Sequence, residues 1–179
     1  MMDYKSQAAP REITPDGTPV FCSYDEVVKI DQLQPNPGNP NTHGSKQIAM
    51  LGDIIMAAGW RAPITVSKRS GLITKGHGRR MAAIHKHLSY APVEYQEYAS
   101  EAEEHADLIA DNRIAELSDL SMEKLMDMIQ EIDTGELPIE LTGFTDDDIK
   151  KIIAAMDGTD DAVDDKADKS ANVSGGGDI

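Results

Sequence analysis

The sequence of 179 residues contains a single cysteine, Cys22, and only 4% of its side chains are aromatic. One cysteine excludes an internal disulfide bond and a zinc site built on cysteine ligands. No run of 18 apolar residues occurs, so the sequence predicts no membrane-spanning helix and no membrane partner. The first eleven residues lack the apolar stretch of a secretory signal, and we therefore expect a cytoplasmic protein.

Acidic residues are absent from one segment of an otherwise acidic chain. The formal net charge is −15, from 32 acids and 17 bases. Residues 54–93 nevertheless carry seven Lys or Arg and no Asp or Glu, whereas residues 94–179 carry 25 acids and 6 bases. An acidic chain repels DNA over most of its surface. The pattern therefore favours a nucleotide, or a DNA contact through a local basic patch, over a broad DNA-binding surface.

Hydrophobic periodicity predicts a chain of short strands and amphipathic helices. The predicted strands are residues 26–30, 63–67, 72–74 and 92–95, the second and third forming a hairpin. The predicted helices are residues 46–58, 79–88, 100–116, 121–132 and 145–156. The segment 33–41 contains three prolines and three asparagines, so we expect a loop there.

Composition divides the chain into four parts. Residues 1–23 are polar and rich in proline, so we expect a flexible arm. Residues 24–116 hold the strands and most of the apolar periodicity, and form the predicted domain. Residues 117–156 form an acidic helical segment, and residues 157–179 have the composition of a disordered acidic tail.

A turn with two glycines joins a predicted strand to a predicted helix at residues 73–80. Gly76 and Gly78 leave the backbone open to close approach, and amides at a helix start attract anions. Arg79 and Arg80 add donors that match phosphate oxygens. The pattern is typical of a phosphate site, although an ordinary turn with two solvated arginines would look the same. His77, inside the turn, is the histidine that we associate with catalysis.

Three polar residues in succession, Asp111, Asn112 and Arg113, lie on the predicted helix 100–116. Together they cover most of the helix circumference, so at least one faces inward or toward a ligand. Asp111 or Asn112 offers an oxygen to Mg²⁺, which needs few protein ligands when phosphates supply the rest. A capping or interhelix hydrogen bond would explain the same residues.

Four short motifs follow one another along residues 24–156. They are residues 36–41 ahead of the helix that holds Gln47, residues 59–64, residues 73–83 and residues 110–113. In this order they resemble the ParB/sulfiredoxin fold, and most closely the short ParB-like N-terminal domain proteins of phages and mobile elements. The resemblance implies an α+β fold, in which a small mixed sheet packs with helices and a C-terminal helical segment follows.

The resemblance also implies a nucleotide site. In ParB proteins the matching glycine turn holds the triphosphate of CTP, and sulfiredoxin uses a related turn for ATP. The implied cofactors are therefore Mg²⁺ and CTP or ATP. The residues implied to bind the nucleotide are Gln47, Arg61, Gly76, His77, Gly78, Arg79 and Arg80, and those implied to bind the metal are Asp111 and Asn112.

The sequence departs from the family pattern in three places. His77 stands where ParB proteins usually have glutamate. Sulfiredoxin needs a cysteine in this turn, whereas Cys22 lies in the predicted arm, so we expect no peroxiredoxin repair. Residues 114–156 hold 11 acids and three lysines, which argues against a helix-turn-helix reader of centromeric DNA.

Three functions fit these observations. The leading hypothesis is a nucleotide-binding protein of a phage or mobile element that acts in DNA metabolism, with slow Mg²⁺-dependent NTP hydrolysis left open. The second is a ParB-like DNA nuclease in which His77 transfers a proton. The third is a non-enzymatic adaptor for a DNA-modifying enzyme, whose acidic C-terminal region binds a basic protein partner.

Overall fold

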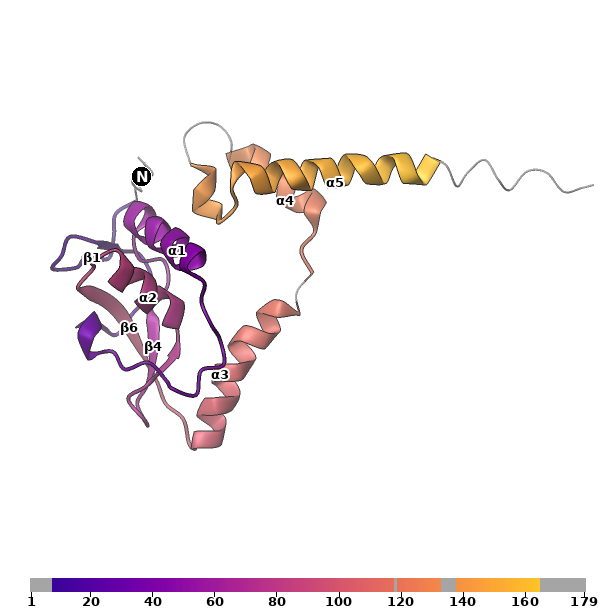
Figure 1. The fold of residues 1–179 in the computed structure, drawn as a ribbon. Helices are drawn as coiled ribbons and strands as arrows, with labels where there is room; N and C mark the ends of the chain where they lie inside the picture. Colours follow the sequence, from indigo (N-terminus) through magenta and orange to yellow (C-terminus); the bar gives the residue numbers. More distant parts are fainter. Residues whose placement is uncertain (1–7, 118, 133–137, 165–179) are drawn as a thin grey trace, which may run out of the picture. The chain divides into compact units, whose positions relative to one another are not determined.

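The structure is a computed structural model that describes residues 8–117, 119–132 and 138–164. The chain divides into two compact units, Met1–Gly143 and Phe144–Ile179. Every strand of the described residues lies in the first unit (Figure 1). None of the described helices is both long and apolar enough to cross a membrane.

A four-stranded mixed sheet lies at the centre of the first unit. Its strands are β3 (Glu26–Lys29), β4 (Ile64–Ser67), β5 (Ile73–Lys75) and β6 (Tyr90–Gln96), in the order β3-β6-β4-β5. The β4–β6 pair is parallel and the other two pairs are antiparallel. This confirms the predicted strands, the predicted hairpin and the α+β class with a small mixed sheet.

Helices α1 (Ser45–Ala58) and α2 (His77–His85) pack against each other beside the sheet. Alanines on α2 let the helix approach the core, where Ala82 and Ala83 are fully buried. Trp60 follows α1 and is also fully buried. α1 ends at Ala58, and the capping residue Gly59 adopts φ 74°, a conformation that glycine reaches without strain.

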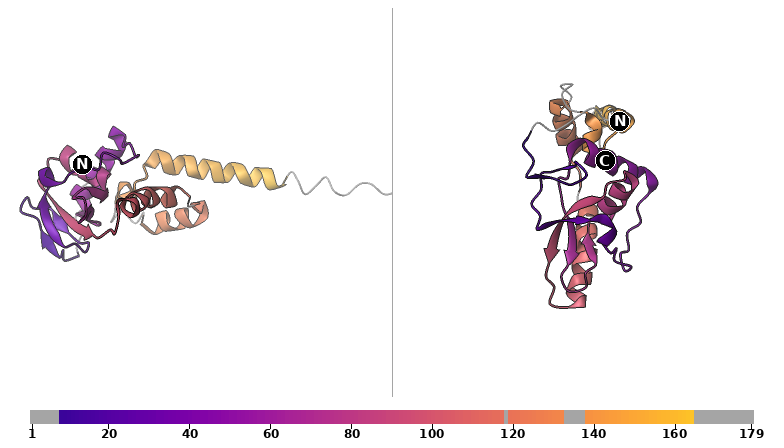
Figure 2. Two further views of the ribbon diagram at one scale, coloured as in Figure 1. Left: turned by 90° about the horizontal axis from the view of Figure 1, so that it is seen from below. Right: turned by 90° about the vertical axis from the view of Figure 1, so that its left-hand side faces the viewer.

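Helix α3 (Glu101–Glu116) runs beside the β4–β5 part of the sheet in Figures 1 and 2. Successive strand residues point to opposite faces, so Val66 enters the core while Ser67 points toward α3. The Ser67 hydroxyl donates a hydrogen bond of 2.7 Å to the Glu104 carboxylate. Leu108, also on α3, is 2% exposed.

The predicted flexible arm is wrong for the part that the structure describes. Strands β1 (Glu12–Ile13) and β2 (Pro19–Val20) form an antiparallel hairpin. The Trp60 N–H donates to the Pro19 carbonyl at 2.8 Å, and Val20 is fully buried. The prolines and Gly17 therefore shape a turn, and the hairpin is held by backbone bonds to a residue forty positions away.

The C-terminal part continues as helices. The first unit ends with α4 (Met122–Ile132) and the short 3-10 helix η2 (Ile139–Thr142), which contacts α1. The second unit contains α5 (Asp146–Asp164), whose first turn is capped by the Thr145 hydroxyl. The prediction that this helix stops at residue 156 is wrong, because α5 continues to residue 164. The rest of the predicted disordered tail lies outside the described residues.

Candidate functional site

The glycine turn between β5 and α2 has the geometry of an open helix start. Gly76 precedes the first helical residue and adopts φ 91°, a left-handed conformation that disfavours other residues. A side-chain carbon at Gly76 would lie 3.2 Å from Nε and Nη2 of Arg79. The guanidinium therefore folds back over the turn, and α2 begins at His77, two residues earlier than predicted.

The loop between β3 and α1 covers this turn. The Asn36 N–H donates a hydrogen bond of 3.2 Å to Nε2 of His77. A side-chain carbon at Gly78 would lie 3.1 Å from the His43 ring, so the absence of a side chain at Gly78 makes room for that imidazole. Nδ1 of His43 lies 3.2 Å from Oε1 of Gln47, which ties the loop to the first turn of α1.

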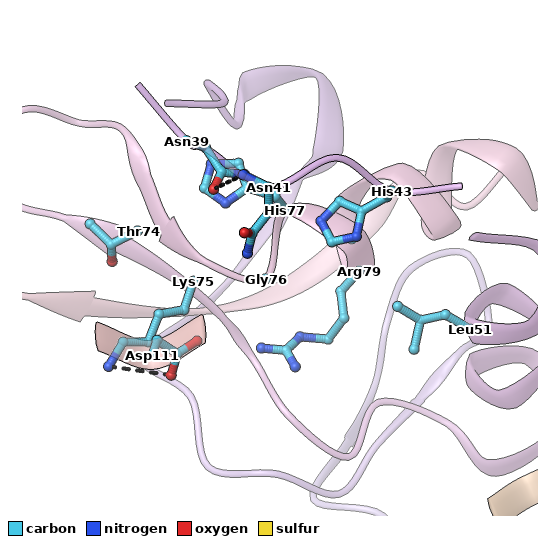
Figure 3. Close-up of a pocket in the computed structure, with 11 residues that line it drawn as sticks. Asn39, Asn41, His43, Leu51, Thr74, Lys75, Gly76, His77, Arg79 and Asp111 are labelled. Atoms are coloured by element: carbon cyan, nitrogen blue, oxygen red, sulfur yellow. Dashed lines mark hydrogen bonds and ion pairs between the residues drawn. The ribbon is translucent and has the colours of Figure 1, made fainter. Parts of the chain in front are cut away.

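Together the turn and the loop enclose a cavity of about 190 Å³, which we call the glycine-turn pocket. Figure 3 shows side chains from the loop, β5, α1, α2 and α3 converging on it. Its predicted members are Gly76, His77, Gly78, Arg79 and Asp111. The other residues that line it are Asn39, Asn41, His43, Leu51, Thr74 and Lys75.

The other predicted site residues lie elsewhere. Gln47 reaches the pocket only through its contact with His43. Nε of Arg61 donates to the Ala58 carbonyl at 3.0 Å, and its guanidinium stacks on a phenylalanine ring. Arg80 lines two neighbouring hollows, because successive helix residues point about 100° apart. The side chain of Asn112 lies outside the described residues.

Arg79 is a buried cation that lines the glycine-turn pocket. Its guanidinium extends toward Asp111 and Lys75 in Figure 3. Burial lowers the pKa of Arg79 and the charge of Asp111 raises it, and an arginine stays protonated under such shifts. Nε of Arg79 is buried without a hydrogen-bond partner, as is Nε of Arg80, which lines the neighbouring hollows. A buried donor of this kind is costly unless an acceptor meets it, so the pocket suits an anion.

Lys75 brings a second cation to the pocket wall. Its Nζ lies 3.0 Å from Oδ1 of Asp107 and 3.9 Å from Oδ1 of Asp111, both on α3. The Tyr98 hydroxyl donates to Oδ2 of Asp107 at 2.6 Å. The sequence contained one clue to this residue, since Lys75 is a cation directly before the glycine turn.

His77 is held in one tautomer by its neighbours. Burial lowers the pKa of His77, and the nearby charges of His43 and Arg80 lower it further, so the imidazole is neutral at pH 7. Because Nε2 accepts the bond from Asn36, the ring proton lies on Nδ1. A proton-transfer role for His77 would therefore have to use Nδ1.

Cys22 is nearer to this site than the sequence suggested. It interacts electrostatically with Arg79, although it belongs to the segment after the N-terminal hairpin. Burial raises the pKa of the Cys22 thiol, and the charge of Arg79 offsets this only in part. The thiol is therefore protonated at neutral pH, and Cys22 lacks the thiolate that a nucleophile needs.

The basic segment 54–93 is largely neutralised by acids from outside it. Four of its seven cations form ion pairs of 2.6–3.0 Å, which are Lys68 with Glu97, Arg69 with Glu104, Lys75 with Asp107 and Lys86 with Asp53. Within the described part of the chain, Arg61, Arg79 and Arg80 form no ion pair. The uncompensated positive charge of this segment is therefore limited to fewer residues than the sequence suggests.

A buried arginine at a glycine-bracketed helix start, on a small mixed sheet, defines an α+β domain with an anion pocket. No protein-family model matches the chain. It is 36% identical over 64 residues to the ParB-like nuclease domain-containing protein YnaK of Escherichia coli strain K12, a match that spans 36% of this chain and 72% of YnaK. The chain therefore belongs to the ParB-like nuclease domain family, as its motifs predicted.

A solved structure supports the fold. The C-terminally truncated chromosome-partitioning protein ParB from Caulobacter crescentus, crystallised with CTP-γ-S, aligns with a TM-score of 0.52 and 20% identity. The alignment covers 82% of this chain and 94% of that one. The predicted ParB-like fold is thereby confirmed.

Proposed function

We propose that the glycine-turn pocket binds the phosphates of a nucleoside triphosphate, CTP or ATP, and that the protein acts in the DNA metabolism of a phage or mobile element. The observation that carries this proposal is the buried Arg79, whose Nε has no hydrogen-bond partner beside the amides of a helix start. The CTP-γ-S complex of Caulobacter crescentus ParB supports the same ligand class.

Of the two residues assigned to Mg²⁺ from the sequence, Asp111 is the one whose side chain the structure describes. Asp111 lines the pocket, but both it and Asp107 pair with Lys75. We therefore assign no step to a metal, and we treat slow NTP hydrolysis as a separate proposal, to be measured as phosphate release.

Two neighbouring arginines give a matched test. Calorimetric titration with CTP, ATP and GTP should show binding of at least one nucleotide to the wild-type protein. Arg79→Met should weaken that binding by about ten- to a hundredfold, because charge-assisted hydrogen bonds contribute roughly 1.5–3 kcal/mol. Arg80→Met removes the same charge one residue away and should change the affinity by less than about threefold. No binding to the wild-type protein, or equal losses in both variants, would contradict the proposal.

A DNA nuclease is the second candidate, and the name of the Escherichia coli relative favours it. The pocket would then grip a phosphodiester, and the neutral His77 would transfer a proton through Nδ1. Plasmid DNA incubated with the protein and Mg²⁺ or Mn²⁺ should be nicked, and His77→Ala should abolish the nicking. Intact plasmid, or equal nicking by the variant, would remove this candidate.

An adaptor role rests on the acidic C-terminal helices. The first turn of α5 carries three successive carboxylates, Asp146, Asp147 and Asp148. We propose that this helix recognises a basic protein partner. Removing the second unit after Gly143 should abolish capture of that partner without changing nucleotide binding, and unchanged capture would contradict this role.

A further inference from the structure

The Lys75 ammonium sits between two carboxylates at the wall of the glycine-turn pocket. Asp107 and Asp111 are four residues apart on α3, so their side chains share one face of the helix. Their Oδ1 atoms lie 3.0 Å and 3.9 Å from Nζ of Lys75. Asp111, which lines the pocket, and Asp107, one helical turn earlier, are thus both paired with a cation that belongs to the chain itself.

Neighbouring side chains hold this cation in place. Asp107 uses its second oxygen to accept the Tyr98 hydroxyl at 2.6 Å, and the same hydroxyl lies 3.3 Å from Oγ1 of Thr74. Thr74 and Lys75 both line the pocket. The side chain of Lys75 is 31% exposed, so the ammonium remains accessible to a ligand while Asp107 fixes its position.

A divalent cation would make the same contacts. Mg²⁺ at a phosphate site is commonly held by one or two carboxylates and completes its coordination with phosphate oxygens and water. An ammonium group has three donors. Held by Asp107, it has donors left for a phosphate oxygen. In this pocket the Lys75 ammonium lies against the carboxylates that a metal would otherwise use.

We propose that Lys75 is the counter-cation of the bound triphosphate, so that this pocket binds its nucleotide without a divalent metal. The inference rests on the proposed nucleotide binding. Lys75 keeps its bond to Asp107 and donates to a phosphate oxygen, while Arg79 meets the phosphates from α2. Asp111 remains the carboxylate that faces both cations.

The test compares nucleotide affinity in EDTA and in Mg²⁺, using the full chain and the nucleotide that binds best among CTP, ATP and GTP. The wild-type dissociation constants should agree within about threefold. Lys75→Met should lose about tenfold or more in EDTA and recover part of that loss in Mg²⁺, because Asp107 and Asp111 become free to hold the metal. Lys68→Met is the matched control, since Lys68 pairs with the exposed Glu97 away from the pocket. It should behave as the wild type does.

Each other outcome has a definite meaning. Wild-type binding that requires Mg²⁺ would overturn the inference and leave the proposed function standing. An equal loss for Lys75→Met in both buffers would give the lysine a purely structural role and also overturn it. The wild-type comparison needs no variant, so a misfolded Lys75→Met, detected by circular dichroism, would not prevent the decision. No binding in either buffer would remove the proposed function itself.

Discussion

Glu104 offers the sharpest test of how α3 is fixed beside the pocket. Its carboxylate is 1% exposed and accepts hydrogen bonds from the Ser67 hydroxyl at 2.7 Å, the Ser70 hydroxyl at 2.7 Å and Nε of Arg69 at 3.0 Å. The Ser67 oxygen in turn accepts the backbone N–H groups of Arg69 and Ser70. One buried carboxylate therefore joins the β4–β5 turn to the helix that carries Asp107 and Asp111.

The cost of Glu104→Ala follows from what the substitution leaves behind. The Ser67 hydroxyl is 1% exposed and would lose its acceptor, which costs roughly 1–3 kcal/mol. The Arg69 side chain is 35% exposed, so water would replace part of its lost ion pair. Complete burial of the pair would raise the cost to about 3–5 kcal/mol. We therefore expect a loss of about 2–4 kcal/mol in the free energy of unfolding.

Urea denaturation followed by circular dichroism measures this loss. The control is Glu101→Ala on the same helix, where the carboxylate is 70% exposed and lies 4.0 Å from His105; it should change stability by less than about 0.5 kcal/mol. A cost below about 1 kcal/mol for Glu104→Ala would refute the reasoning, because the hydrogen bonds of this carboxylate would then contribute little to holding α3 against the β4–β5 turn.

The pH dependence gives an independent check on the same residue. Desolvation raises the pKa of Glu104, but the bonds from Ser70, Ser67 and Arg69 outweigh it, so the folded pKa lies below the ordinary 4.5. Stability from a lowered carboxyl pKa is present above the unfolded value and is lost as the pH falls through the folded value. The cost of Glu104→Ala should accordingly shrink below about pH 4.5, and a constant cost down to acid pH would contradict the assignment.

Three further perturbations test other parts of the first unit. Gly76→Ala should destabilise the protein by more than Gly71→Ala, since both glycines have positive φ but, of the two, Gly76 alone is crowded by neighbouring atoms. The positive φ alone should cost each variant about 1–2 kcal/mol, and the midpoints of urea denaturation measure the difference between them. Burial and the bond to Asp107 raise the pKa of Tyr98 to about 12; Asp107→Asn should lower it toward 10, which tyrosine ring NMR would follow. Burial raises the pKa of Asp16, but its hydrogen bonds, two of them from backbone N–H groups after α2, lower it overall. Asp16→Ala should cost about 1 kcal/mol at pH 7, a loss that disappears once the pH falls through the depressed folded pKa; a loss that persisted there would contradict this.

The sheet and helices could be predicted because their signals are local. The short run of β-branched residues in β4 predicts a strand, and the apolar stripe of α1 predicts a helix with one buried face. The N-terminal hairpin escaped prediction because it depends on backbone bonds to Trp60, which no pattern near residues 12–20 encodes. The end of α5 differs from the prediction because an acidic composition is typical of disordered segments but is also compatible with a helix.

The pocket residues also divide into those that the sequence predicts and those that it does not. Gly76, His77, Gly78 and Arg79 could be assigned because the chemistry lies in one continuous turn. Arg80 was assigned with them from sequence adjacency, although the turn of the helix directs it to neighbouring hollows. Lys75 was missed because its importance depends on α3, whose carboxylates are more than thirty positions away.

The ion pairs of Lys68, Arg69, Lys75 and Lys86 also bear on how a nucleotide arrives. With those charges compensated, a triphosphate at long range meets the field of a molecule with net charge −15 and is repelled. The triphosphate is attracted only once it enters the glycine-turn pocket. Added salt screens the repulsion over distances of about 10 Å, so encounter should speed up as ionic strength rises, the reverse of a site that guides its ligand electrostatically.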